Sequence, residues 1–192
     1  MKRAVAVLLT LSAPLLAGTA GAATVGVVRG TVAGDTALDT RIGVWAVSPF
    51  GQPLQQLADA PLQDGKFALT LPTAAPAERL QFAVGERTSW PGLVDFAGTS
   101  VPLRATELKF FLYRDSNGNG QRDEGEALRE VRPSVGKGEL FVVWAATPAT
   151  VSGAGGYQAD LQAGWNTLVV EVRRPVRVQP YSGANVDINL GR

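Results

Sequence analysis

Short apolar runs separated by Gly, Pro, Asp and Asn make up most of the chain, and this rhythm predicts β-strands. The clearest example covers residues 66–71, where Phe67, Leu69 and Leu71 alternate with other side chains as in a half-buried strand. Residues 108–113 are apolar at almost every position, which predicts a central strand that is buried on both faces. Further strands are expected at residues 25–32, 41–47, 80–84, 139–146, 167–172, 176–178 and 186–190.

Helical signals are weak by comparison. Residues 54–60 and 73–79 could each form a turn or two, but prolines at 53, 61, 72 and 76 interrupt both segments. About nine or ten strands fit an all-β fold, and we expect a single β-sandwich of the prealbumin-like or immunoglobulin-like type. The expected domain covers residues 23–192, with a possible internal boundary near residues 98–106.

The first 22 residues have the pattern of a cleaved secretory signal peptide. Lys2 and Arg3 form a basic start, residues 4–16 are largely apolar, and Ala20, Gly21 and Ala22 form a small-residue cleavage site. The apolar stretch is shorter than the ~20 residues of a spanning helix, so no membrane span is expected. The protein is therefore expected to be exported, to a periplasmic, cell-surface or extracellular location.

Composition removes several classes of function. The chain contains no His and no Cys, which excludes disulfides, thiol nucleophiles, the usual zinc sites and His-based catalytic pairs. Of 18 basic and 17 acidic residues, Lys2 and Arg3 belong to the predicted leader, so the net charge of the remainder is near −1. This balance argues against nucleic acid as a partner. We expect a monomeric protein that is not an enzyme and is held together by its core.

Residues 115–126, with the sequence DSNGNGQRDEGE, match a twelve-residue calcium loop. Such loops offer oxygen ligands at positions 1, 3, 5, 7, 9 and 12 and have Gly at position 6 for a sharp turn. Gly120 stands at position 6. The expected ligands of Ca²⁺ are the residues at the six ligand positions: Asp115, Asn117, Asn119, Gln121, Asp123 and Glu126.

A solvated polar turn and a pair of catalytic carboxylates account for this segment less well than a metal does. A polar turn also favours Asn, Asp and Gly, but it gives no reason for ligand spacing at six positions. Paired carboxylates of a glycosidase need rigid positions across a cleft, which a short loop does not provide. Only three ligands are acidic, so the expected affinity is weak, with a dissociation constant on the order of 10⁻⁴ to 10⁻³ M. Because Pro133 follows closely and no second loop exists, we expect a loop between strands and not an EF-hand domain.

The segment from Phe111 to Glu126 resembles calcium loops in the repeat domains of Gram-positive surface adhesins, of the Cna-B or SD-repeat B type. That resemblance covers about sixteen residues and implies the metal, not adhesion. Residues 28–32, 42–47 and 65–72 are similar to the opening strands of carboxypeptidase-regulatory-like or transthyretin-like sandwiches. This second resemblance implies a non-catalytic structural or binding module.

The four tryptophans offer an alternative function. Trp45 and Trp144 lie inside apolar runs and are expected in the core. Trp90 and Trp165 lie beside turns and could stack on sugars in a carbohydrate-binding module. We therefore expect a secreted or envelope β-sandwich stabilised by Ca²⁺, whose partner is an unidentified protein or glycan, with carbohydrate binding through Trp90 or Trp165 as the alternative.

Overall fold

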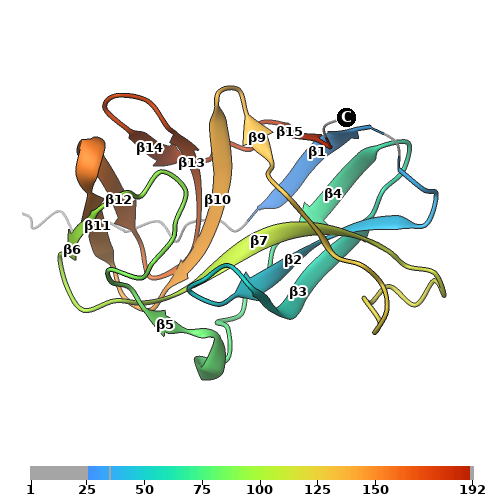
Figure 1. Ribbon diagram of the computed structural model, residues 1–192, viewed down its shortest axis with the longest axis horizontal. Coiled ribbons are helices and arrows are strands. Elements are labelled where there is room, and N and C mark those ends of the chain that lie inside the picture. Colours follow the sequence, from blue (N-terminus) through green and yellow to red (C-terminus); the bar gives the residue numbers. More distant parts are fainter. Residues whose placement is uncertain (1–25, 35, 191–192) are drawn as a thin grey trace, which may run out of the picture.

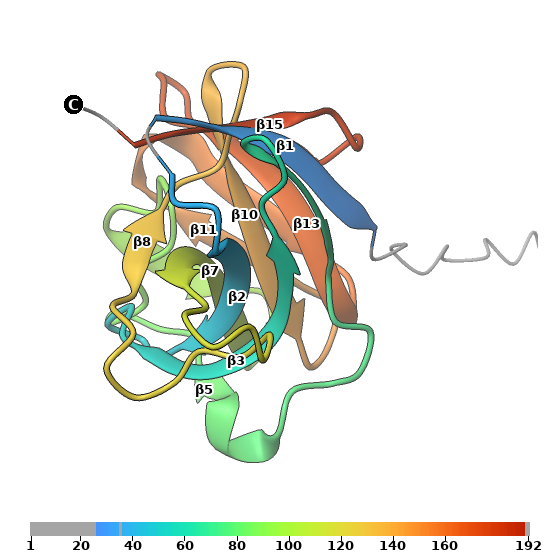
Figure 2. The same cartoon turned by 90° about the vertical axis from the view of Figure 1, so that its right-hand side faces the viewer.

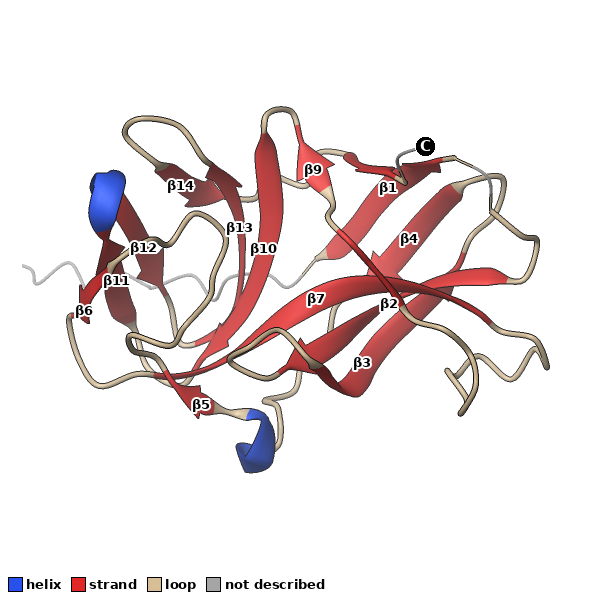
Figure 3. Ribbon diagram, viewed as in Figure 1, coloured by secondary structure: helices blue, strands red, loops and turns tan. Residues whose placement is uncertain are grey.

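A computed structural model describes residues 26–34 and 36–190, and within them the regular structure is almost entirely β (Figure 1, Figure 3). The only helical pieces of this described part are two single 3₁₀ turns, η1 (Glu78–Leu80) and η2 (Ala154–Gly156). The strands are β1 (Val27–Ala33), β2 (Thr40–Val47), β3 (Pro53–Pro61), β4 (Lys66–Thr70), β5 (Phe82–Ala83), β6 (Phe96–Thr99), β7 (Arg104–Arg114), β8 (Arg129–Val131), β9 (Ser134–Val135), β10 (Gly138–Ala145), β11 (Ala149–Gly153), β12 (Tyr157–Leu161), β13 (Gly164–Glu171), β14 (Arg177–Pro180) and β15 (Val186–Asn189). The predicted all-β class is confirmed.

The main sheet has twelve strands and curls into a nearly closed barrel, not the clear two-sheet sandwich that the sequence pattern suggested. Its longest hydrogen-bonded path runs β3-β2-β7-β10-β9-β15-β1-β4, and the two end strands β3 and β4 lie against each other. Figure 2 shows these strands arranged around a common interior. Alternating side chains specify which face of a strand is buried, but they do not specify whether a sheet closes on itself.

A second sheet of three strands, ordered β12-β11-β6, lies at the opposite end of the molecule from the barrel (Figure 1). One apolar core fills the barrel, and a second core lies between the small sheet and strands of the main sheet. Strand β10 contributes to both cores, because Leu140 and Val142 face the first and Phe141 and Val143 face the second. The expected boundary near residues 98–106 includes the segment that connects β6 to β7.

Each segment predicted as a strand overlaps an observed strand, whereas β3, β6, β8, β9, β11 and β12 were not predicted. Residues 54–60, considered as a helical turn, belong to strand β3, since pairing with β2 along its length overrides the weak local preference. Residues 73–79 contain only the start of η1. The predicted signal peptide, residues 1–22, lies outside the described residues. No helix among the described residues is long and apolar enough to cross a membrane.

Gly30 in β1 occupies a close approach between backbones. A Cβ atom at this position would collide with the carbonyl oxygen of Val186 in β15 and would lie 2.9 Å from the Phe67 ring. β1 runs parallel to β15 and antiparallel to β4 here, so neither neighbour can move without breaking the ladder.

We predict that Gly30→Ala lowers the free energy of unfolding by about 1–3 kcal/mol, as overpacking of a filled site does. The matched control is Gly85→Ala, because a Cβ there meets nothing within 4 Å. Urea titration of both variants measures the difference. Equal stability of the two variants would show that β1 and β15 are not packed as described.

Candidate functional site

The twelve residues of the predicted calcium loop connect the end of β7 to β8, and all six predicted ligands lie in this one connection (Figure 1). Asp115 follows directly after β7 and is only 6% exposed. Its Oδ1 accepts a hydrogen bond from the Asn119 backbone N–H at 3.0 Å, and its Oδ2 accepts one from the Gly120 N–H at 2.9 Å. The buried carboxylate of Asp115 therefore holds the first half of the loop in a turn through these two hydrogen bonds.

Glu126 closes the loop from the other end. Its Oε1 accepts a hydrogen bond from the Ser116 N–H at 2.8 Å, and its Oε2 accepts one from the Asp123 N–H at 2.9 Å. The two oxygens of one carboxylate thus join the beginning of the loop to its end. The Glu126 side chain, at position 12, therefore holds Ser116, ten residues earlier, close to the end of the loop.

The middle of the loop is held by its amide side chains. Asn117 and Asn119 donate from Nδ2 to Asp123 Oδ2, at 2.7 and 2.8 Å. Their Oδ1 atoms accept hydrogen bonds from the backbone N–H groups of Asn119 and Gln121, at 3.0 and 2.7 Å. Five of the six predicted ligands are therefore joined in one hydrogen-bonded network, while Gln121 contributes its backbone.

The loop offers carboxylate and amide oxygens, which is the donor chemistry that Ca²⁺ prefers. A carboxylate oxygen has lone pairs for both an N–H group and a cation. In the described part of the chain, however, no three side chains of Asp, Glu, His or Cys are gathered as a metal cluster. The types of ligand atom in the loop are therefore those that calcium prefers. Backbone N–H groups orient the carboxylates of Asp115 and Glu126.

Side chains from strands β2, β3 and β7 contact the loop, and the sequence pattern did not predict these contacts. Arg41 in β2 donates from Nε to Asp59 Oδ2 at 2.7 Å, and its Nη1 lies 3.7 Å from Asp115 Oδ2. The Tyr113 hydroxyl donates to the Gly120 carbonyl at 3.2 Å, and Gln56 Oε1 accepts from the Arg122 N–H at 3.3 Å. Burial raises the pKa of Tyr113, which keeps this hydroxyl a donor.

A small apolar cluster on the outside of the barrel supports the same region. Trp45 packs edge-on against Phe111 and Tyr113, with ring centroids 5.4 and 5.7 Å apart. Leu128, just after the loop, packs against this cluster. The predicted buried position of Trp45 is confirmed, and its cluster includes residues on both sides of the loop.

Neither tryptophan proposed for sugar stacking is an exposed platform. Trp165 is buried in the barrel core, and its Nε1 donates to the Ala74 carbonyl at 2.9 Å. Trp90 is buried in the second core, 5.2 Å from the Phe141 ring. Each of the two side chains borders a cavity, Trp90 beside Glu107 and Trp165 beside Tyr181, but neither is exposed on the surface.

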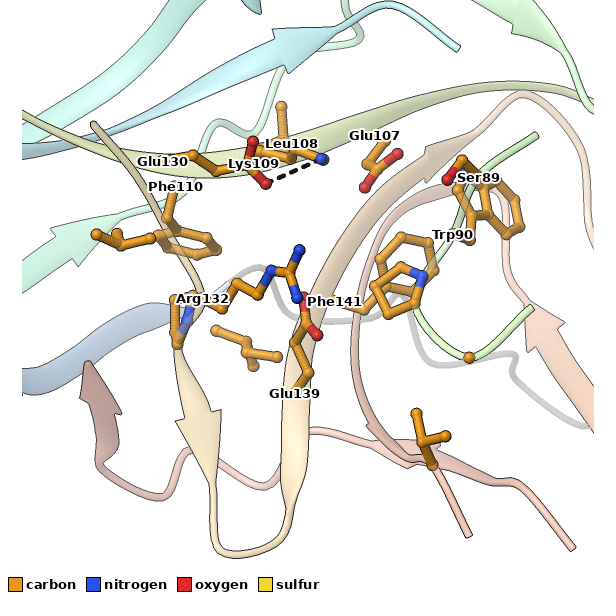
Figure 4. Close-up of a pocket in the computed structure, with 16 residues that line it drawn as sticks. Ser89, Trp90, Glu107, Leu108, Lys109, Phe110, Glu130, Arg132, Glu139 and Phe141 are labelled. Carbon is orange, nitrogen blue, oxygen red and sulfur yellow. Dashed lines mark hydrogen bonds and ion pairs between the residues drawn. The ribbon is translucent and has the colours of Figure 1, made fainter. Parts of the chain in front are cut away.

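That cavity, of about 290 Å³, is a second candidate site that the sequence did not reveal (Figure 4). Glu107 of β7 lies in its wall and is 9% exposed, yet its side chain has no hydrogen bond or ion pair with any described residue. Burial, together with the nearby carboxyl groups of Glu130 and Glu139, outweighs the attraction of Lys109 and raises the pKa of Glu107 to about 8. The carboxyl group is therefore mostly protonated at neutral pH.

Comparisons of the chain with models of protein families, with curated proteins and with solved structures give no match, and no family is identified.

The buried Glu107 predicts a pH dependence of stability. In the unfolded chain it loses its proton near its ordinary pKa of 4.5, whereas the folded protein keeps the proton up to about pH 8. Because the folded state binds more protons at Glu107 in this window, the contribution of this group to stability is most favourable below the lower value. It falls as pH rises to the upper value, with a slope of up to ~1.4 kcal/mol per pH unit.

We predict that Glu107→Gln removes this dependence, since Gln resembles the neutral acid and does not ionise. The stability of the variant relative to the parent should increase from about pH 5 to about pH 8 and then level off. The exposed Glu78→Gln in η1 is the control with the same change of charge. Denaturant titrations across this range measure it, and a constant difference between Glu107→Gln and the parent would exclude a buried neutral Glu107.

Proposed function

We propose that this chain is an exported, non-enzymatic β module in which loop 115–126 binds Ca²⁺ and is stabilised by it. The observation that carries the proposal is the loop itself. Oxygen-bearing side chains occupy ligand positions 1, 3, 5, 9 and 12, and both acidic ends already orient the backbone of the loop.

In this proposal, Asp115, Asn117, Asn119, Asp123 and Glu126 supply side-chain oxygens and Gln121 supplies its carbonyl. Three of the proposed ligands are carboxylates, and Glu124 is a fourth acid in the same twelve residues. These acids repel one another, and hydrogen bonds to N–H groups offset only part of that repulsion. A bound Ca²⁺ supplies two positive charges to this loop. Asp115 and Glu126 would hold the ends, so the strand β7 and the segment before β8 would be tied together.

Arg41 argues for weak binding. Its guanidinium lies 3.7 Å from Asp115 Oδ2 and already provides one positive charge to the most buried ligand. With only three acidic ligands and this cation nearby, the dissociation constant belongs at the extracellular end of the range, on the order of 10⁻⁴ to 10⁻³ M. A weak site of this kind fits a module that works outside the cytoplasm, where the predicted signal peptide of residues 1–22 would send it.

The resemblance to transthyretin-like modules concerns β1, β2 and β4, and it supports a structural or binding role with an unidentified protein or glycan partner. A monomer without nucleic-acid partners agrees with the charge balance near neutrality. Carbohydrate binding remains the second candidate. It ranks lower because Trp90 and Trp165 are buried and neither presents an open ring face for stacking.

We predict that calcium raises the melting temperature of the parent protein and that Glu126→Gln abolishes the increase. At ten times the dissociation constant, binding adds about 1.4 kcal/mol, which corresponds to roughly 3–6 °C for a chain of this size. Thermal unfolding is measured in calcium and in chelator. Because Glu126 also accepts two backbone N–H groups, the variant should already melt lower in chelator. The informative quantity is therefore the calcium-dependent increment.

The matched control is Glu124→Gln, which removes an acid from the same loop at position 10, where no ligand is expected. This variant should keep the full increment. Loss of the increment in both variants would indicate a general charge effect, and no increment in the parent would overturn the calcium proposal.

A further inference from the structure

The cavity beside Glu107 has the composition of a built binding site, and it is separate from the calcium loop. Glu107 extends from β7 toward the space in front of Trp90 and Phe141 (Figure 4). The residue is 9% exposed, and its side chain has no hydrogen-bonding partner among the described residues. The carboxyl group therefore depends on what fills the cavity, either water or a ligand, to offset the cost of its burial.

Besides Glu107, the cavity lining carries two acids and two cations. Lys109 Nζ lies 2.9 Å from Glu130 Oε1, and Lys109 also attracts the ionised form of Glu107. Arg132 attracts the carboxylate of Glu139 on β10, and both line the same cavity. Tyr157, which packs in the second core and interacts electrostatically with Glu107, is neutral because burial raises its pKa. With Glu107 ionised, the lining holds three acids and two cations and is negative.

Two aromatic rings complete the arrangement. Trp90 and Phe141 pack with their centroids 5.2 Å apart at an interplanar angle of 52°, and both line the cavity. Trp90 and Phe141 are 6% and 1% exposed, so only a small part of each ring borders the cavity, and that part is apolar surface against which the carbon chain of a ligand can lie. An acid beside apolar aromatic surface suits an organic cation better than an anion.

We propose that this cavity binds a small organic cation, an alkylammonium group whose charge pairs with Glu107 and whose carbon chain contacts Trp90 and Phe141. Its volume of about 290 Å³ accommodates a ligand of a few carbon atoms. A free aliphatic amine presents this chemistry.

Binding would be linked to one proton. In the empty cavity the Glu107 carboxyl holds its proton at neutral pH. When the ammonium enters, the O–H bond of the carboxyl breaks, the proton passes to the solvent, and the carboxylate forms an ion pair with the ligand. Affinity should therefore rise about ten-fold per pH unit up to about pH 8 and then level off while the amine stays protonated.

The test is calorimetric titration of the whole protein with n-butylammonium and, as an uncharged match, 1-butanol, both in chelator so that calcium plays no part. We expect the parent to bind butylammonium at about pH 8, with about one proton released per ligand near neutral pH, as judged from buffers of different ionisation enthalpy. Glu107→Gln should lower the affinity at least ten-fold, and Glu78→Gln should leave it unchanged.

Glu107→Gln keeps the shape of the protonated acid, so the variant is expected to fold, and its far-UV circular dichroism verifies this. Equal binding of butanol and butylammonium, undiminished binding by Glu107→Gln, or binding without proton release would each overturn the proposal. The absence of any butylammonium binding to the parent would overturn it as well. Because calcium is excluded throughout, none of these outcomes bears on the loop.

Discussion

Pairing of strand β7 with four neighbouring strands is the constraint on which both candidate sites depend. Its backbone is hydrogen-bonded to β2, β10, β5 and β8. Side chains then alternate between the two faces, so that Leu108, Phe110 and Leu112 fill the barrel. The other face carries Glu107, Phe111, Tyr113 and, one step beyond the strand, Asp115. The pairing register of β7 therefore sets the positions of Glu107 in the cavity wall, of Tyr113 beside the loop and of Asp115, the first predicted ligand.

Two buried acids on this face have different surroundings. The carboxylate of Asp115 accepts hydrogen bonds from two backbone N–H groups and lies 3.7 Å from the Arg41 guanidinium. The Glu107 side chain has no such donor among the described residues, and burial raises its pKa to about 8. The two acids therefore differ in the hydrogen-bond donors that offset the cost of burial.

The sequence predicted the features that depend on residues close together in the chain, namely individual strands and the loop. Alternation at residues 66–71 located β4, the apolar run at residues 108–113 lies within β7, and ligand spacing placed six positions in one loop. Closure of the sheet was not predicted, because it depends on contacts such as that between β3 and β4, which no local pattern specifies. Arg41, Gln56 and Glu107 were missed for a similar reason. Each is an ordinary polar residue in its own strand, and only pairing with distant strands brings it to a site.

The most direct measurement of the central claim is a calcium titration of the isotope-labelled protein followed by NMR through its backbone amide resonances. Calcium binding at residues 115–126 predicts saturable shifts with a midpoint on the order of 10⁻⁴ to 10⁻³ M. The shifts should be largest at the amides of Asn119, Gly120 and Asp123, which donate hydrogen bonds to the acidic side chains. Unchanged resonances throughout residues 115–126, or shifts confined to another part of the chain, would contradict it.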